Sequence, residues 1–312
     1  MIPFAVAVVP AYLRTGQDAR WLRRGVEALL AQPAVGRVLV ADDGSPCPVP
    51  PLPEGVEVLK TPVNAGPAAA RNRGIARALG LGAEVVLFTD HDCLCEPGWA
   101  KGLLDALKPG RVAASGVTRA LGRGLLDRYQ DFAGAMNGRW ALPGHDSLIY
   151  GPSCNLAVRA GALAEVRFDE RFPTAAGEDY DFCHRLRRLG TIAFVPEAVV
   201  RHDFGYRGLG GLGRLLRQEC RYGSADALLW EKHAELHALP SEACAPPDVG
   251  ADPFPTDPSA YRRGALSRVR PRRYAPFFLL MKHLCRHAYR RGQHAPGRWR
   301  EGPLPVGEMG TT

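Results

Sequence analysis

Short apolar runs alternate with segments of helical periodicity over the first hundred residues. The apolar runs predict buried strands, and apolar residues three or four positions apart predict one-sided helices. The expected strands cover residues 4–9, 37–41, 56–60 and 84–88, and the expected helices cover residues 18–30 and 67–79. Buried strands that alternate with helices are typical of a mainly parallel sheet covered on both faces. The pattern therefore predicts the α/β fold class.

The rest of the chain has less regular spacing. Further helices are expected over residues 97–107 and 180–189, and further strands over residues 112–117, 192–195 and 198–201. A Gly-rich start at residue 205 leads into helical periodicity up to residue 233. Residues 240–276 hold eight prolines, which predict an extended linker or wrapping segment.

An amphipathic basic helix is expected after the prolines. Its apolar face would carry Phe277, Leu280, Met281, Leu284, Cys285 and Ala288, and its basic face Lys282, Arg286 and Arg290. The longest apolar run, residues 275–281, is far shorter than the ~20 residues that a membrane-spanning helix needs. Because no basic-then-apolar signal opens the chain, we expect a cytoplasmic protein.

The positive charge of the chain gathers in one segment. There are 40 Lys and Arg against 32 Asp and Glu, which gives a formal net charge of +8. Residues 262–300 hold twelve basic residues and no acidic one, so the remainder has a net charge of −4. Such a segment favours an anionic neighbour. It fits peripheral contact of residues 274–300 with the inner face of an anionic membrane, an anionic acceptor, or the acidic body itself; nucleic acid is the least favoured partner.

Composition excludes several classes of protein. A hydrophobic content of 46% and a charged content of 23% are ordinary for a globular protein and exclude a disordered or fibrous chain. The eight cysteines show no paired spacing, and Cys93 and Cys95 have no second pair nearby, so a structural zinc site is not expected. Reduced thiols are the default in a cytoplasmic chain.

Two acidic clusters follow predicted strands. Asp42 and Asp43 end the second strand, and Asp90 and Asp92 follow the fourth. Side chains two positions apart point the same way on extended backbone, so Asp90 and Asp92 can converge on one ion. A divalent ion such as Mg²⁺ uses one or two carboxylates together with substrate phosphates. Because ligands collect at the carboxyl ends of parallel strands, both clusters are candidate site residues.

Over residues 6–204 the sequence resembles family 2 glycosyltransferases of the GT-A fold. The matching segments are, in order, VVPAY at 8–12, VADDGS at 40–45, NAG at 64–66, ARNRG at 70–74, Asp90-His-Asp92, GPSCNLAVR at 151–159 and Gly-Glu-Asp at 177–179. Each match alone is weak, and the ordered set is specific. The resemblance implies a Rossmann-like, mixed but mainly parallel sheet flanked by helices. It also implies a catalytic domain over 1–204, with donor and metal in 1–118 and the acceptor side in 119–204, followed by a helical and proline-rich extension over 205–312.

The resemblance implies a nucleotide-sugar donor, most simply UDP-linked, and a divalent metal. Residues expected at the donor are Pro10, Ala11, Tyr12, Asp42 or Asp43, Asn64, Gly66, Arg71, Asp90 and His91. The metal would be held by Asp92 and Asp90 together with His202, and imidazole beside carboxylates suits Mn²⁺ better than Mg²⁺. His91 departs from the small or acidic residue usual at its position, and contact with the ribose or with solvent both stay open.

Catalysis, on the same resemblance, needs one base. Asp179 would take the proton from the acceptor hydroxyl in a single inverting displacement, and Glu178 would assist by orienting the acceptor. Both carboxylates also open a predicted helix, where they complement the helix dipole, and the two interpretations are compatible. The acceptor stays open among a glycan, a lipid-linked sugar, a natural product and a peptide.

Other interpretations also fit parts of the sequence. Residues 218–222, QECRY, are similar to the Q-x-x-R-W signature of processive synthases, but those span membranes, so we interpret the match as chance or vestigial and expect transfer of one sugar. A nucleotidyl-transferring relative would carry a Gly-rich basic loop after the first strand, which is absent here. A non-catalytic relative would be expected to lose Asp92 or Asp179, and both are present.

Overall fold

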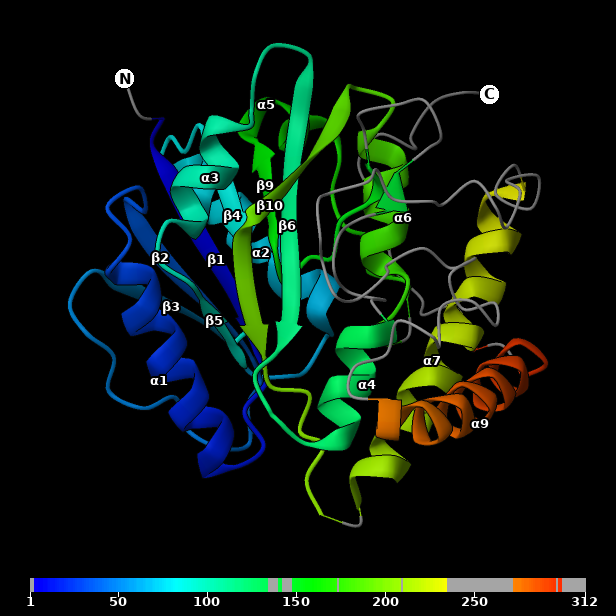
Figure 1. The fold of residues 1–312 in the computed structure, drawn as a ribbon. Helices are drawn as coiled ribbons and strands as arrows, with labels where there is room; N and C mark the ends of the chain where they lie inside the picture. Colours follow the sequence, from blue (N-terminus) through cyan, green and yellow to red (C-terminus); the bar gives the residue numbers. More distant parts are fainter. Residues whose placement is uncertain are drawn as a thin grey trace.

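The computed structural model describes residues 3–133, 140–141, 148–172, 174–208, 210–234, 272–295 and 297–298. Its centre is an eight-stranded sheet in the order β3-β2-β1-β4-β9-β6-β10-β5, with helices on both faces (Figure 1). The strands are β1 (Ala5–Ala11), β2 (Arg37–Asp43), β3 (Val56–Thr61), β4 (Val85–Phe88), β5 (Cys93–Cys95), β6 (Arg111–Ala120), β9 (Leu156–Arg159) and β10 (Thr191–His202). A small second sheet pairs β7 (Trp140–Ala141) with β8 (Leu148–Tyr150).

The main sheet is mixed and mainly parallel, which confirms the fold class predicted from the sequence. Pairings β1–β2, β1–β4, β2–β3 and β6–β10 are parallel, whereas β9 and β5 run antiparallel to their neighbours. Consequently β1, β2, β4 and β10 all end at the same edge. The acidic clusters therefore meet there.

Helices cover both faces of this sheet. They are α1 (Gly16–Leu30), α2 (Pro67–Gly80), α3 (Trp99–Asp105), α4 (Leu125–Ala133), α5 (Ala160–Glu165), α6 (Glu178–Leu186), α7 (Gly210–Lys232), the 3₁₀ turn η3 (Arg272–Tyr274) and α9 (Ala275–Gln293). Side chains of β1 alternate between two cores, because Val6 and Val8 pack with α2 and α6 while Ala7 and Val9 pack with α1 and α3. Such two-sided burial explains the continuous apolar pattern of the strand.

One strand differs from the sequence prediction. Residues 192–195 and 198–201 were expected as two short strands, and they form the single strand β10. Its pairing with β6 shifts register between Phe194 and Val199. Ala198 lies so close to Gly116 there that a side chain at Gly116 would come within 1.8 Å of the Ala198 carbonyl oxygen. A bulge opposite a glycine thus joins the two halves.

The expected basic helix exists as α9 and packs on the body of the protein. Phe278, Met281 and Cys285 are buried in a third core that α4 and α7 complete. Leu280, expected on the buried face, is 55% exposed. Close approach of α7 and α9 requires Gly223 and Gly292, because a Cβ at either would lie 1.9 Å from a carbonyl oxygen of the other helix.

The proline-rich linker expected over residues 240–276 lies almost wholly outside the described residues, which resume at residue 272. It therefore stays a prediction. Among the helices that the structure describes, none combines the length and apolar character needed to cross a bilayer.

Candidate active site

A cavity of about 1020 Å³ opens where β1, β4 and β10 end. Residues between positions 10 and 204 form one part of its wall, and residues of α7 and α9 form the other. Of the residues predicted from the sequence, those lining it are Pro10, Ala11, Tyr12, Asp43, Asn64, Gly66, Arg71, Asp90, His91, Asp92, Glu178, Asp179 and His202. Asp42 is not among the described residues that line it. The expected residues are thus brought to one cavity with a single exception.

The two aspartates that end β2 have different surroundings. Asp42 is buried and its Oδ1 accepts a hydrogen bond from the backbone N–H of Ser45, three residues further on, at 3.1 Å. Asp43 accepts from the backbone N–H groups of Ala65 at 3.0 Å and Gly66 at 2.7 Å. Gly66 has a φ of 99°, a conformation that favours glycine, immediately before α2 begins. Asp43 therefore fixes the loop that borders the cavity.

Arg71 connects the turn after β4 with the first residue of α6. Its guanidinium donates to Asp90 at 3.0 Å and to Glu178 at 2.9 Å, and the residue is 4% exposed. Burial by itself lowers the pKa of Arg71, but the charges of Asp90 and Glu178 outweigh burial and raise it. Helix α2 can carry Arg71 to this place because Gly74 lies against Val8 of β1, where a Cβ would come within 2.3 Å of Val8 Cγ1.

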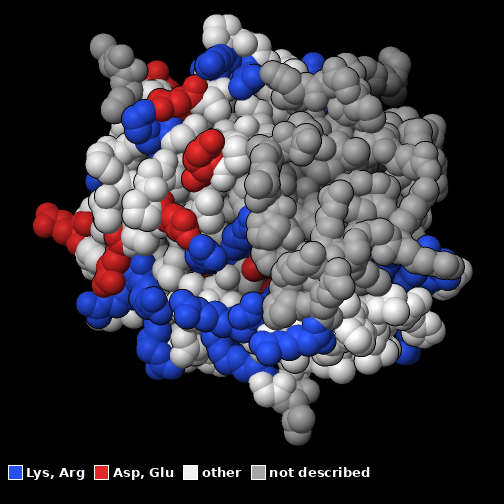
Figure 2. Space-filling model, in the orientation of Figure 1, with Lys and Arg blue, Asp and Glu red and all other residues white. Residues whose placement is uncertain are grey.

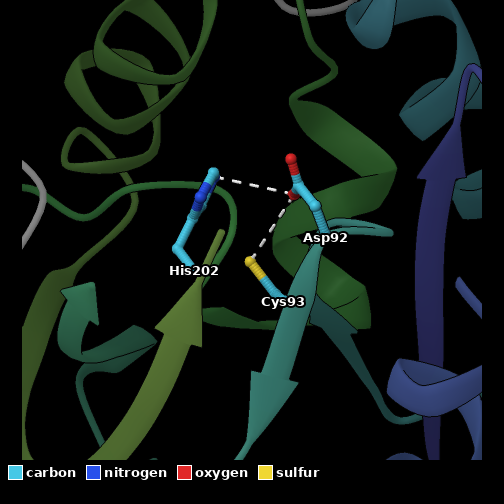
Figure 3. Close-up of side chains that lie close together, drawn as sticks. All are labelled: Asp92, Cys93 and His202. Atoms are coloured by element: carbon cyan, nitrogen blue, oxygen red, sulfur yellow. Dashed lines mark hydrogen bonds and ion pairs between the residues drawn. The ribbon is translucent and has the colours of Figure 1, made fainter. Parts of the chain in front are cut away.

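Asp92, Cys93 and His202 converge at the sheet edge (Figure 3). One ligand atom from each lies within 4.8 Å of the others, a set that could hold a metal ion. His202 Nε2 lies 3.6 Å from Asp92 Oδ1. His202 Nδ1 is buried and has no hydrogen-bond partner among the described residues. Asp90, predicted as a further ligand, is not in this group and its carboxylate instead pairs with Arg71.

Hydrogen bonds orient Asp179 at the start of α6. Its Oδ2 accepts from the Tyr150 hydroxyl at 3.1 Å and from the Ser153 N–H at 3.3 Å, while Oδ1 accepts from the Tyr180 N–H at 2.9 Å. Burial raises the pKa of the Asp179 carboxyl. Burial and then the charge of Asp179 raise the pKa of Glu178 to about 7, although Arg71 opposes this. Two adjacent carboxyls with raised pKa values in a cleft are typical of a catalytic site.

A buried ionic cluster anchors the same helix from behind. Asp181 is fully buried and pairs with Arg185 at 2.6 Å, Lys232 at 2.8 Å and His233 at 2.7 Å. Lys232 also pairs with the buried Asp169 at 2.8 Å. Burial raises the pKa of Asp181, but the hydrogen bond from His233 and the charges of Arg185 and Lys232 hold it well below its usual range. The end of α7 is therefore tied to α6 two residues beyond Asp179.

Several residues of the cavity wall were not predicted as site residues. Tyr150 and Ser153 contact Asp179, as described above, and α7 contributes Gln218, Glu219, Arg221, Tyr222 and Asp226. Most of the α7 residues belong to the QECRY segment, whose match to a synthase signature was interpreted as chance or vestigial. Its position on the cavity wall argues against chance, and the motif itself was the signal that could have identified α7 as part of the site. Within it, the Gln218 side-chain amide donates to the Tyr222 hydroxyl at 2.6 Å.

Comparisons with known proteins point to one family. Residues 6–164 match the profile of the family described as "Glycosyl transferase family 2". The pre-mycofactocin glycosyltransferases of two Mycobacterium tuberculosis strains, CDC 1551 / Oshkosh and ATCC 25618 / H37Rv, are each 32% identical over 234 residues, which cover 71% of this chain and 47% of theirs. The chain thus spans about half the length of these curated relatives.

Solved structures with low sequence identity share the fold. A mannosyltransferase from Pyrobaculum calidifontis, solved with GDP-Man and Mn²⁺, gives a TM-score of 0.57 at 16% identity and covers 94% of this chain and 88% of its own. GalNAc-T7, solved with UDP, GalNAc and Mn²⁺, gives 0.53 at 15% identity over 67% of this chain and 44% of its own. These likenesses confirm the GT-A fold. Together with the family match, they establish that the chain belongs to glycosyl transferase family 2.

Proposed function

We propose that this protein is a metal-dependent, inverting glycosyltransferase that moves one sugar from a UDP-linked donor to an acceptor hydroxyl. The observation that carries the proposal is that one cavity is lined both by the Asp92 and His202 pair and by the hydrogen-bonded Asp179. A leaving diphosphate and an attacking hydroxyl need those two kinds of group on opposite sides of the transferred sugar.

Asp92 and His202 are the residues proposed to hold a divalent ion. The donor set fits, because a carboxylate oxygen and an imidazole nitrogen face each other at 3.6 Å, and this mixed set favours Mn²⁺ over Mg²⁺. Such an ion, when bound, neutralises negative charge that develops on the leaving diphosphate. Asp90 would not bind the ion itself but would position Arg71 beside the metal site through their ion pair.

Donor binding is assigned to the ends of β1 and β2 and the loop before α2. Tyr12 is 38% exposed and offers a ring face to a nucleotide base, while Asp43 holds the loop that carries Asn64 and Gly66. Lys and Arg side chains form a band across the lower part of the face in Figure 2. A positive surface of this kind favours an anionic donor.

Asp179 is proposed as the base that accepts the proton of the attacking hydroxyl. Tyr150 and Ser153 hold its Oδ2 in place, and Glu178 is held by Arg71. One displacement at the sugar carbon inverts its configuration. The acceptor would lie between α6 and α7, so that residues 205–312 act as a cap. A glycan, a lipid-linked sugar, a natural product or a peptide can supply the hydroxyl, and pre-mycofactocin, after which the curated relatives are named, is the first acceptor to test.

A donor panel tests this function directly. The full chain is incubated with Mn²⁺ and each nucleotide sugar without acceptor, and slow release of nucleoside diphosphate is measured. Hydrolysis of a UDP-sugar that stops on removal of the metal by a chelator is the expected result. Absence of binding and hydrolysis for every donor would overturn the enzyme proposal, and release of a nucleoside monophosphate would indicate nucleotidyl transfer instead.

A further inference from the structure

A thiol lies beside the carboxylate and imidazole of the proposed metal site. Cys93 begins β5 and is directly opposite His202 in the antiparallel pairing of β5 with β10. Directly opposed residues of such a pair place their side chains on the same face of the sheet. The Asp203 N–H donates to the Asp92 carbonyl at 2.9 Å and holds the adjacent turn against the end of β10. Figure 3 shows the three side chains directed toward one another.

The separations between these atoms suit one shared ion. With zinc bond lengths of about 2.1 Å to nitrogen or oxygen and about 2.3 Å to sulfur, tetrahedral angles put N and O about 3.4 Å apart and S and O about 3.6 Å apart. The corresponding distances to Asp92 Oδ1 are 3.6 Å from His202 Nε2 and 4.0 Å from Cys93 Sγ. Each exceeds the requirement by less than half an ångström. A contraction of that size needs only small side-chain rotations.

The contacts of the His202 imidazole and the Cys93 thiol with the described residues leave both groups able to bind an ion. His202 Nδ1 has no partner among the described residues, and its ring stacks on Phe204 with centroids 4.4 Å apart, which restricts its orientation. Cys93 is 1% exposed, and besides its long contact with Asp92 it contacts the Cys154 thiol. A cysteine in the core would ordinarily serve as a small apolar residue. Here the residue belongs to the buried core, yet its sulfur lies 4.0 Å from Asp92 Oδ1.

We propose that Cys93 is a third protein ligand of the ion held by Asp92 and His202. This rests on the proposed function and extends it to the choice of metal. On binding, the thiol loses its proton to solvent and a sulfur lone pair forms the bond to the ion. An oxygen, nitrogen and sulfur set suits Zn²⁺ and Co²⁺ better than Mn²⁺ and disfavours Mg²⁺, which prefers oxygen ligands. Positions not used by protein remain for diphosphate oxygens.

Cobalt provides a direct spectroscopic readout of the bond. The full chain, metal-free and without nucleotide, is titrated with Co²⁺, and binding of Mn²⁺ to a second metal-free sample is followed by electron paramagnetic resonance. The expected result is a thiolate-to-cobalt charge-transfer band in the near ultraviolet that saturates with one ion. Binding of Co²⁺ without that band would overturn the assignment of Cys93 and leave the glycosyltransferase proposal intact. Failure of both ions to bind would overturn the metal site as well.

Matched variants locate the sulfur. Cys93→Ser should lose the band and bind Zn²⁺ at least about tenfold more weakly, since even outer-shell partners of metal ligands are worth that much. Mg²⁺ affinity should change little. Cys154→Ser, whose sulfur borders the same core, and Cys47→Ser, whose thiol contacts the Pro48 carbonyl, should both keep the band. Loss of the band in Cys154→Ser with retention in Cys93→Ser would contradict the proposal, and absence of the band from the wild-type spectrum overturns it even where a variant fails to fold.

Discussion

Arg71 donates to Glu178 at 2.9 Å across the cavity, and this buried ion pair joins α2 to the first residue of α6. The same guanidinium holds Asp90 at 3.0 Å. One side chain therefore ties the turn that carries Asp92 to the helix that carries Asp179. Movement of either element would break a pair that is shielded from water.

Arg71→Met should destabilise the protein strongly. Removing one partner leaves Glu178 and Asp90 without compensation, and breaking a buried pair costs about 3–5 kcal/mol. Urea denaturation measures the loss. Arg77→Met on the same helix is the control, because Arg77 forms a solvent-exposed pair with Glu57, which should contribute little to stability. Equal losses of unfolding free energy in the two variants would show that the buried ion pairs of Arg71 stabilise the protein no more than the exposed pair of Arg77.

Asp179→Asn should abolish transfer while donor binding is retained. The amide is nearly isosteric and can keep the contacts with Tyr150 and Ser153, but it cannot take a proton. General base catalysis is typically worth about 10²–10⁴-fold in rate. Single-turnover transfer and donor affinity are measured side by side, with Asp105→Asn on the exposed surface of α3 as the control. An unimpaired rate would assign the base elsewhere.

Asp92→Ala should weaken Mn²⁺-dependent donor binding more than Asp90→Ala does. Asp92 faces His202, whereas Asp90 is engaged by Arg71. Mn²⁺ affinity and donor affinity of both variants can be measured by calorimetry. If the two variants bind alike, the structural distinction between these carboxylates has no functional consequence.

Asp181→Asn should destabilise the junction of α6 with α7. The change leaves Arg185 and Lys232 facing a neutral group in a fully buried place, so a loss of about 3–5 kcal/mol is expected. Thermal and urea unfolding report it. Glu27→Gln removes the exposed partner of Arg23 on α1 and should change stability by no more than about 0.5 kcal/mol.

Stability should fall as the pH rises through the titration of two carboxyls on α7. Burial and the charge of Asp226 raise the pKa of Glu219 to about 7, and burial raises that of Asp226 to about 6. The folded state then holds more protons than the unfolded state between about pH 4 and 7, so the free energy of unfolding decreases with pH in that window.

The double variant Glu219→Gln, Asp226→Asn isolates this effect. Each unit of raised pKa corresponds to about 1.4 kcal/mol, so the variant should gain stability relative to wild type as the pH rises from 4 to 8. Urea denaturation across this range measures the difference. If the stability difference between the variant and wild type does not change with pH, Glu219 and Asp226 are not the source of the pH dependence.

Much of the site follows from local patterns. Apolar runs end at Asp43 and shortly before Asp90, and the start of α6 at Glu178 is marked by its acidic first turn. Parallel strands bring their carboxyl ends to one edge of the sheet, so the location of the site at that edge could be predicted. The α7 wall could be predicted only from the QECRY motif itself, because the helical periodicity of this segment is the same whether or not it faces a cavity.

The sequence by itself determined the strands and helices up to residue 88, the sheet edge that collects the carboxylates and the family that the chain resembles, because strand and helix periodicity depend on neighbouring residues. It did not predict β5, β9, α4 or α5. Tertiary structure decided which charged groups pair with one another. Asp90 forms an ion pair with Arg71, and Cys93 lies opposite His202 in the β5–β10 pairing. Asp42 accepts a hydrogen bond from Ser45 within its own turn. These choices depend on strand register and on close contacts such as that of Gly74 with Val8, which join residues far apart in the chain.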